Sequence, residues 1–283
     1  MIDSINMILS IITINYNNAQ GLKKTLDSVS VQTCKELEHV IIDGGSTDGS
    51  KEVIKEYANN ALCSVSWVSE KDNGIYNAMN KGIKRALGEY IQILNSGDCL
   101  ASDDVVERML KTLDEYIQRG DNPDILYGNM IKIGSNGKIV DKSTYTEYSL
   151  RQFYSSTLNH DCAYIKKVLF EKYGYYDESL KIVSDWKWYL QAIGLGHVKP
   201  IYVDIDVTHF DAEGISETNL ELRNEERRKV LEDVVPPAVL WDYDKHAFDA
   251  EQMNRLRSWH LYKPVWFIER CLRRIESLKN GKL

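Results

Sequence analysis

The first hundred residues alternate between apolar runs and segments whose apolar residues recur at helical spacing. Residues 7–14 form a nearly continuous apolar run, which is typical of a parallel strand buried on both faces. Leu22, Leu26 and Val29 then recur as they would on one face of a helix. Further strands are expected at 37–42, 65–68 and 90–94, and further helices at 53–58 and 75–86. This order predicts an α/β fold with a mostly parallel central sheet flanked by helices, because such crossovers join parallel strands.

Beyond residue 100 the pattern is less regular. Asp103 and Asp104 stand where a helix dipole favours acids, so we expect a helix to start there. The remaining expected elements are a strand at 124–127, a hairpin over 131–140 that turns at 135–137, helices at 166–172 and 185–193, and a strand at 201–207. Residues 216–283 have a helical pattern with a break at Pro236-Pro237. We therefore expect one large domain over residues 1–215 and a helical C-terminal extension over 216–283.

The charge of the chain is unevenly distributed. The net charge of −7 argues against a general nucleic-acid binder, which needs a basic face. Residues 255–283, however, hold eight Lys and Arg against two Glu, and the aromatic residues Trp259, Tyr262, Trp266 and Phe267 lie among them. Such a segment suits a helix on an anionic bilayer, and it equally suits a terminal helix docked on the main domain with its basic face in water.

Cysteine usage indicates a reducing compartment. The five cysteines are widely separated, odd in number, and form no Cys-x-x-Cys pair, which argues against a disulfide framework and against a zinc site. The first apolar run is too short to span a membrane and lacks a basic leader. We expect a cytoplasmic protein, either free or peripheral on the inner face of the cell membrane.

Polar residues follow three of the predicted strands at the points where these strands end. They are Asn15-Tyr16, Asp43 and Asp98, and ligands of open α/β sheets bind at this edge. The chain has neither Gly-x-Gly-x-x-Gly after the first strand nor a P-loop. A nucleotide site without such a loop needs positive charge from elsewhere, and a divalent cation on a carboxylate can supply it. Residues 95–98 are thus either a plain turn or one edge of a nucleotide site.

Four segments in order resemble glycosyltransferase family 2. They are Ser10-Ile-Ile-Thr-Ile-Asn-Tyr-Asn17, Val40-Ile-Ile-Asp-Gly-Gly-Ser-Thr-Asp48, Asn80-Lys-Gly-Ile83 and Gly88-Glu-Tyr-Ile-Gln-Ile-Leu-Asn-Ser-Gly-Asp98. The resemblance implies a GT-A fold, with a nucleotide-sugar-binding half over residues 1–100 and an acceptor half over 101–215. It also implies inverting transfer of a sugar from a nucleotide donor.

The resemblance assigns nucleotide contacts to six residues. Tyr16 would pack against the base, and Asp43 would accept a hydrogen bond from the imide N–H, which makes uracil the expected base. Asp72 would contact the nucleotide or the donor sugar. A turn residue is the alternative for Asp43, and a helix N-cap before Ile75 is the alternative for Asp72. The full expected set is Ile14, Tyr16, Asp43, Asp72, Ser96 and Gly97.

The resemblance also implies a divalent metal, Mn²⁺ or Mg²⁺. Asp98 matches the last acid of the family's Asp-x-Asp element, but Asn95 and Gly97 stand where further acids are usual, so the metal's identity stays open. His209 matches a late histidine that some GT-A enzymes bring to the metal; a solvent-facing or core histidine is the alternative. Asp103 and Asp104 could compete as ligands, but a helix start explains them.

The segment Ile182-Val-Ser-Asp-Trp-Lys-Trp-Tyr189 resembles the family's second acidic motif. Asp185 would be the base that takes the proton of the acceptor hydroxyl, and Ser184 replaces a more usual Glu. The alternative for Asp185 is a helix cap. His160 is expected to line or support the site, and the aromatic residues at 186, 188 and 189 could face a sugar or pack into the core.

The sequence thus predicts an inverting transferase that moves a sugar from a UDP-sugar to a saccharide or lipid-linked acceptor in cell-surface polysaccharide biosynthesis. Two alternatives remain. A silent nucleotide-sugar-binding protein fits the missing acids. A sugar-nucleotidyltransferase fits the α/β pattern but usually has a glycine- and basic-rich first loop.

Overall fold

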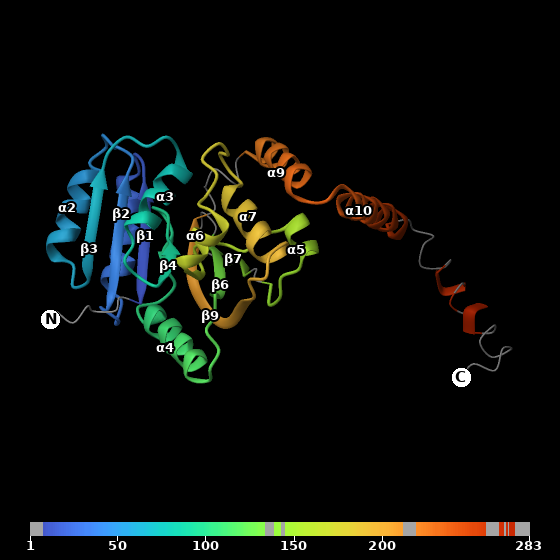
Figure 1. The fold of residues 1–283 in the computed structure, drawn as a ribbon, viewed down its shortest axis with the longest axis horizontal. Helices are drawn as coiled ribbons and strands as arrows, with labels where there is room; N and C mark the ends of the chain where they lie inside the picture. Colours follow the sequence, from blue (N-terminus) through green and yellow to red (C-terminus); the bar gives the residue numbers. More distant parts are fainter. Residues whose placement is uncertain are drawn as a thin grey trace. The chain divides into compact units, whose positions relative to one another are not determined.

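The computed structural model describes residues 8–133, 139–142, 145–211, 219–258, 266–268, 270 and 272–274. The chain divides into two compact units, Met1–Val230 and Leu231–Leu283. The first unit carries the sheet that the sequence predicts (Figure 1).

The first half of the sheet is parallel, as expected. Strands β1 (Leu9–Asn15), β2 (Leu37–Asp43), β3 (Ser64–Ser69) and β4 (Tyr90–Ile93) lie in the order β3-β2-β1-β4, and every pairing among them is parallel. Both faces of β1 and β2 are buried, which explains their unbroken apolar runs. The carboxyl ends of β1 and β2 are in register, so Asn15 and Asp43 are direct neighbours.

The second half of the sheet mixes directions. Strand β8 (Ala163–Lys166) pairs antiparallel with β4 and with β6 (Ile125–Ile133), and β6 pairs parallel with β9 (Pro200–Asp211). The short β5 (Cys99–Leu100) ends the order by pairing antiparallel with β9. Strand β7 (Ile139–Lys142) pairs with β6 as the predicted hairpin requires, although its expected turn at 135–137 lies outside the described residues. The resulting mixed sheet confirms the predicted α/β class.

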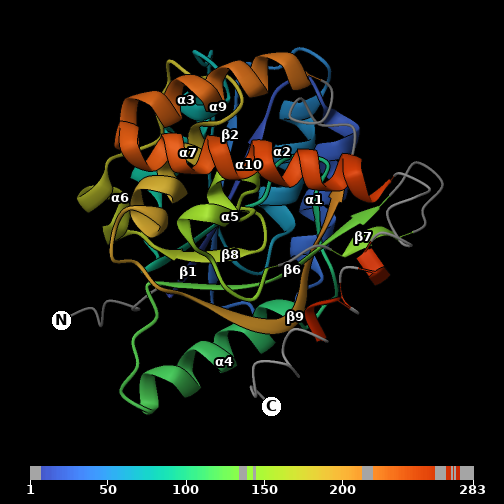
Figure 2. The same ribbon diagram turned by 90° about the vertical axis from the view of Figure 1, so that its right-hand side faces the viewer.

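Helices cover both faces of the first half of the sheet (Figure 2). Leu22 and Leu26 of α1 (Ala19–Ser30) and Ile54 of α2 (Ser50–Asn60) cluster with Ile41. Helix α3 (Ile75–Arg85) packs on the other face, where Gly82 approaches Ile12 so closely that a Cβ would lie 2.3 Å from its side chain. Helix α4 (Val105–Gln118) joins the core beside β9.

The remaining helices of the first unit surround the second half of the sheet. They are α5 (Leu150–Ser155), α6 (Val168–Tyr173), α7 (Ser184–Tyr189) with a π-helical turn at Leu190–Gly194, and the first part of α9 (Leu220–Val234). The sequence pattern did not reveal α5, β5 or β8, each of six residues or fewer.

The second unit contains the end of α9 and helix α10 (Pro237–Arg257). The break between these helices falls at Pro236-Pro237 as predicted, and proline is well tolerated at the first position of a helix. Within the described part of the chain, no helix is both long and apolar enough to cross a membrane.

Candidate active site

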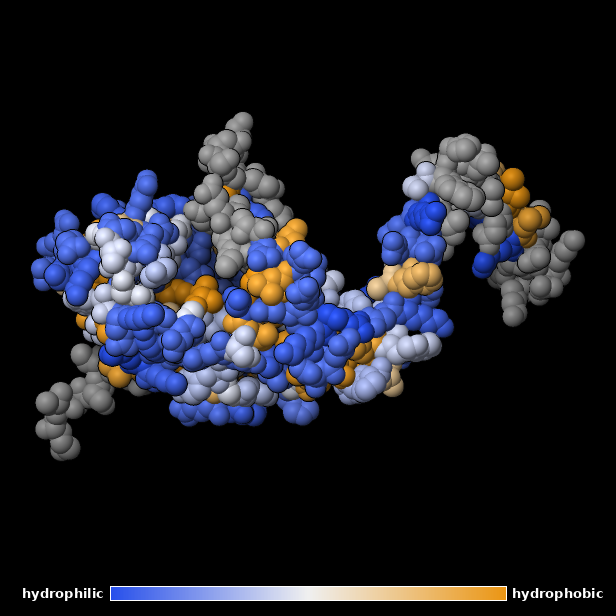
Figure 3. Space-filling view, turned by 90° about the horizontal axis from the view of Figure 1, so that it is seen from above, coloured by the Kyte–Doolittle hydropathy of each residue, from blue (hydrophilic) through white to orange (hydrophobic). Residues whose placement is uncertain are grey.

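A cavity of about 1000 Å³ opens where the carboxyl ends of β1, β2 and β4 meet. Seen from above, the first unit is largely hydrophilic but exposes an apolar patch near its middle (Figure 3). Of the nine predicted site residues, six line this cavity: Ile14, Tyr16, Asp72, Ser96, Asp98 and Asp185. Asp43, Gly97 and His209 do not. The lining also contains residues that the sequence did not single out for the site, among them Asn18, Lys71, Tyr76, Met79 and Lys181.

The end of β1 presents an exposed aromatic ring to the cavity. Tyr16 is 69% exposed, and it follows Asn15 directly at the sheet edge. Asn18 caps α1 by accepting a hydrogen bond from Gly21 N–H (3.0 Å), and its amide also donates to the Ser96 carbonyl (3.2 Å). The turn after β1 is therefore tied to the turn after β4.

Asp43 is completely buried beside this edge. One carboxylate oxygen accepts hydrogen bonds from Asn15 Nδ2 (2.8 Å) and Ser46 Oγ (2.5 Å), and the other accepts from Ser46 N (3.0 Å) and Ser69 Oγ (2.6 Å). Burial alone would raise the pKa of Asp43, but these hydrogen bonds outweigh it and lower the pKa. Its charge thus holds the ends of three strands together. The contact with a base that the resemblance assigns to it stays a prediction.

Unlike Asp43, Asp72 lines the cavity. Lys81 Nζ lies 2.6 Å from it and 2.8 Å from Glu70, so α3 holds the Asp72 side chain in place. A Cβ built on Gly44 would lie 3.1 Å from Asp72 Oδ2 and 3.1 Å from the Tyr16 ring. Asp72 and Tyr16 therefore approach each other above a glycine that leaves room for them. The N-cap of α3 is Gly74, which excludes the alternative helix-cap role of Asp72.

The hydroxyl of Thr25 also holds the turn at residues 95–98. Thr25 Oγ1 accepts from Gly97 N–H (2.9 Å) and donates to the Asp98 carbonyl (2.7 Å). Gly97 has a φ of 113°, a region where side chains are strained, and this explains a glycine at a position where the family usually has an acid. The turn places Asp98, nearly buried, in the cavity lining.

His209 lies close to this turn without lining the cavity. It pairs across β9 and β5 with Cys99, the residue after Asp98. Burial lowers the pKa of His209 and favours the neutral imidazole, the form that binds metals. Among the described residues, no group of three or more His, Cys, Asp or Glu side chains is arranged to hold a metal. Asp98 lies in the cavity lining and His209 outside it, so a metal site shared by these two residues stays a prediction.

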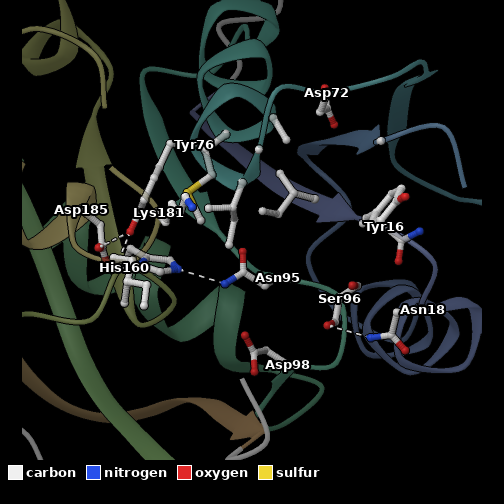
Figure 4. A pocket seen from close by; sticks show the side chains of 18 of the residues that line it. Tyr16, Asn18, Asp72, Tyr76, Asn95, Ser96, Asp98, His160, Lys181 and Asp185 are labelled. Atoms are coloured by element: carbon white, nitrogen blue, oxygen red, sulfur yellow. Dashed lines mark hydrogen bonds and ion pairs between the residues drawn. The ribbon is translucent and has the colours of Figure 1, made fainter. Parts of the chain in front are cut away.

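A hydrogen-bonded network occupies the opposite end of the cavity (Figure 4). His160 Nδ1 lies 2.9 Å from Asp185 Oδ2, and the Tyr76 hydroxyl lies 2.9 Å from Asp185 Oδ1. His160 Nε2 in turn lies 3.1 Å from Asn95 Nδ2. Asp185 stands in the first turn of α7, but the N-cap is Val183 and no side chain caps the helix, so a cap does not explain this acid.

The contact between His160 and Asp185 shifts their two pKa values in opposite directions. Burial alone would lower the pKa of His160, but the hydrogen bond and charge of Asp185 outweigh it and raise the pKa. Burial alone would raise the pKa of Asp185, but His160 and Tyr76 outweigh it and lower the pKa. Opposite shifts of this kind arise wherever an imidazole and a carboxylate are in close contact, because each stabilises the charged form of the other.

Helix α9 supports the end of the cavity that holds His160 and Asp185. Glu226 accepts hydrogen bonds from the backbone N–H of Lys181 (2.8 Å) and of Ile182 (3.0 Å), both of which line the cavity. Arg227 lies over the Trp186 ring at 5.0 Å. The aromatic residues of α7 at 186, 188 and 189 are all buried, so they form core and not a sugar-binding face.

The family of the chain follows from comparison with known proteins. A model described as glycosyl transferase family 2 matches residues 10–174, which is more than half of the chain. The chain belongs to glycosyl transferase family 2. The matched region contains every predicted site residue except Asp185 and His209.

Named relatives are glycosyltransferases. A PGL/p-HBAD biosynthesis glycosyltransferase of Mycobacterium bovis is 26% identical over 208 residues, which cover 72% of this chain and 77% of the relative. A protein of Mycobacterium tuberculosis named as an uncharacterized glycosyltransferase is 29% identical over 210 residues, covering 73% and 76%.

Solved structures share the GT-A fold. S. aureus TarS matches with a TM-score of 0.64 at 22% identity over 81% of this chain, which spans 40% of that TarS chain. TarS 1–349 in complex with UDP-GlcNAc matches with the same score over 80% of this chain and 64% of that one. A mannosyltransferase of Pyrobaculum calidifontis in complex with GDP-Man and Mn²⁺ has a TM-score of 0.58 at 19% identity, covering 81% and 66%.

Proposed function

We propose that this family 2 glycosyltransferase moves a sugar from a UDP-sugar to a saccharide or lipid-linked acceptor, with inversion at the anomeric carbon. One observation carries the proposal: a single cavity joins the exposed Tyr16 ring to the hydrogen-bonded pair of His160 and Asp185 (Figure 4). Asn95 and Asp98 lie between these two ends. A nucleotide at one end and an acceptor hydroxyl at the other would place the reacting sugar between them.

The nucleotide end suits uracil. Tyr16 offers a ring for the base to stack on, and Asp72 is the nearby carboxylate in the lining that can accept a hydrogen bond from an imide N–H. Lys71 also lines the cavity and can offset phosphate charge, whereas Lys181 lies at the end that holds His160 and Asp185 (Figure 4). The UDP-GlcNAc complex of TarS, which has the same fold, supports a uridine nucleotide here.

A divalent cation, Mn²⁺ or Mg²⁺, belongs to the proposal. Asp98 and His209 are the residues that would hold it, next to the turn after β4. Such a cation would neutralise charge on the departing diphosphate. The Mn²⁺ complex of the mannosyltransferase supports a metal in this fold.

The chemistry is a single displacement. The acceptor oxygen forms a bond to the anomeric carbon while the bond from that carbon to the diphosphate oxygen breaks, and UDP leaves with the electron pair. The hydroxyl proton passes to the pair formed by His160 and Asp185, which lies across the cavity from the nucleotide end. Attack from the face opposite the leaving group inverts the anomeric configuration.

The wider assignment belongs to the same proposal. Residues 1–100 would form the nucleotide-sugar half, 101–215 the acceptor half, and 216–283 a helical extension. The acceptor would belong to cell-surface polysaccharide biosynthesis. The protein would act in the cytoplasm or on the inner face of the membrane.

A screen of nucleotide sugars tests the proposal. UDP-glucose, UDP-galactose, UDP-GlcNAc and GDP-mannose would each be incubated with the protein and Mn²⁺ or Mg²⁺, and release of the nucleoside diphosphate would be measured. We expect release from at least one UDP-sugar, because water can replace the acceptor slowly. Tight UDP binding without turnover of any donor would instead favour a silent binding protein, and turnover of GDP-mannose alone would overturn the uracil assignment.

A further inference from the structure

Resting on the proposed function, we propose that Glu226 of α9 is a positioning residue for the transfer. It fixes the segment that leads into α7 and thereby holds Asp185 in place at its end of the cavity. Helix α9 lies outside residues 10–174, which the family model matches, and the sequence assigns residues 216–283 no role in the transfer. The contacts of α9 with the cavity wall argue for such a role.

The segment before α7 has two backbone N–H groups that its own secondary structure does not use. The turn at residues 177–180 closes with an N–H to carbonyl bond of 3.3 Å, and α7 opens with a bond from Lys187 N–H to the Val183 carbonyl (2.9 Å). Lys181 and Ile182 lie between these two bonds. No side chain of α7 or of its N-cap caps the helix. The N–H groups of Lys181 and Ile182 therefore need an acceptor from another element.

Glu226 supplies that acceptor with both of its carboxylate oxygens. Oε1 accepts from Lys181 N–H (2.8 Å), and Oε2 accepts from Ile182 N–H (3.0 Å). Hydrogen bonds to an ionised carboxylate are stronger than those between neutral groups, and a pair of them also fixes direction. Both donor residues line the cavity. Glu226 thus fixes a stretch of the cavity wall from outside.

The fixed segment is connected to Asp185 in two ways. The Ile182 carbonyl accepts from the Tyr76 hydroxyl (2.6 Å), and the same hydroxyl lies 2.9 Å from Asp185 Oδ1. Along the chain, Asp185 follows Ile182 by three residues and stands in the first turn of α7. A displacement of Ile182 would therefore move both the start of α7 and the Tyr76 contact.

A second contact of α9 lies on the other side of Asp185. Arg227 lies over the ring of Trp186 at 5.0 Å, and Trp186 is buried. Val230, one turn further along α9, is buried on the same face of the helix. Helix α9 thus binds the chain before Asp185 and packs on the residue after it.

The position of Glu226 predicts which step it affects. Glu226 lies outside the cavity lining, and the proposed nucleotide contacts Tyr16 and Asp72 lie at the opposite end of the cavity (Figure 4). Loss of the Glu226 contacts should therefore leave nucleotide binding intact and misplace Asp185. A misplacement of about 1 Å can cost about a hundredfold in rate.

Glu226→Gln is the sharpest substitution, because it keeps the size of the side chain but leaves one acceptor oxygen for two N–H groups. UDP-GlcNAc, or the UDP-sugar that the screen finds, serves as the probe at a temperature where circular dichroism shows the variant folded. We expect hydrolysis at saturating donor to fall by about 10- to 100-fold, with the donor KM and the UDP affinity unchanged. Glu225→Gln makes the same charge change at an exposed position of α9 and should behave as the parent does.

The result that overturns the proposal is a folded Glu226→Gln variant that hydrolyses donor at the parent rate, because the contact then serves only folding. Arg227→Met removes the contact on the other side of Asp185 and should lower the same rate without a change in UDP affinity. A fall in UDP affinity that accounts for the lost rate in either variant would also overturn the proposal.

Hydrogen exchange followed by NMR tests the contact without any activity. The N–H groups of Lys181 and Ile182 should be protected in the parent, and at least one should exchange about 10- to 100-fold faster in Glu226→Gln but not in Glu225→Gln. Unprotected N–H groups in the parent overturn the proposal. If the parent turns over no nucleotide sugar, the proposed function fails, and protected N–H groups would still show that the Glu226 contact exists.

Discussion

Replacing Tyr76 by Phe tests the network around Asp185 through stability and pH dependence together. The Tyr76 hydroxyl is buried and lies 2.6 Å from the Ile182 carbonyl and 2.9 Å from Asp185 Oδ1. A hydroxyl has one proton, so these two acceptors share one donor. The substitution keeps the ring and removes only that donor, and it leaves two acceptors near the cavity with one hydrogen bond fewer.

The expected loss of stability follows from this count. Leaving a buried acceptor without its donor costs about 1–3 kcal/mol. For a domain of roughly 150–250 residues each kcal/mol moves the midpoint of thermal unfolding by about 2–4 °C. We therefore expect Tyr76→Phe to lower Tm by about 2–12 °C in differential scanning calorimetry. Tyr175→Phe is the control, because Tyr175 is exposed and its ring contact with Lys84 survives the change.

The same substitution should move the acid limb of donor hydrolysis to higher pH. The Tyr76 hydrogen bond is one of the effects that lower the pKa of Asp185. Without it, the Asp185 charge is less stabilised and holds a proton on His160 more strongly, so the pKa of His160 rises. A variant that unfolds like the parent and keeps the parent pH profile would refute the reasoning.

Three further predictions concern other parts of the chain. Removal of divalent metal by EDTA, or the substitution Asp98→Ala, should weaken UDP binding by about 5- to 150-fold, the usual range for coupling between two bound ligands, as measured by calorimetry. Undiminished UDP binding would remove Asp98 from the metal site. The hydrogen bond from Lys187 lowers the pKa of Asp177 to about 2, so the stabilisation from Asp177 is present above pH 3.8 and is lost as the pH falls toward 2. The Asp177→Asn variant should lack this part of the acid unfolding transition, and acid transitions that superimpose on those of the parent would contradict the prediction. The intact protein should sediment with anionic liposomes in a salt-sensitive manner, because Trp266 is exposed beside Arg270, and a chain that ends at residue 250 should not. Equal sedimentation of the two proteins would exclude membrane binding by residues 251–283.

The parallel half of the fold was predictable because its signals are local. The apolar runs of β1 and β2 and the spacing of Leu22 and Leu26 depend only on neighbouring residues. Strands β5 and β8 were missed because they are too short to show a period, and their pairing depends on distant strands. Both lie next to the site, so the sequence pattern was weakest where the site is assembled.

The candidate site divides in the same way. Asp98 and Tyr16 follow strands, so their place at the sheet edge follows from the chain order. The contact of His160 with Asp185 joins a loop residue before β8 to a residue of α7, 25 positions apart, and no pattern in the sequence reports it. For Asp43 the sequence did contain a signal of a structural role. Ser46, three residues on, is a usual partner of an Asp side chain in a turn, and its N–H and hydroxyl both donate to the Asp43 carboxylate.

The central claim is that this cavity transfers a sugar from a UDP-sugar by a single displacement. Time-resolved ¹H NMR of an α-linked UDP-sugar with the protein and Mn²⁺ tests it most directly, because the anomeric proton reports both cleavage and configuration. We expect the donor signal to decay in step with UDP release and the β-anomer of the sugar to appear first. A donor signal that persists, or an α-anomer that forms first, would contradict a single displacement in this cavity.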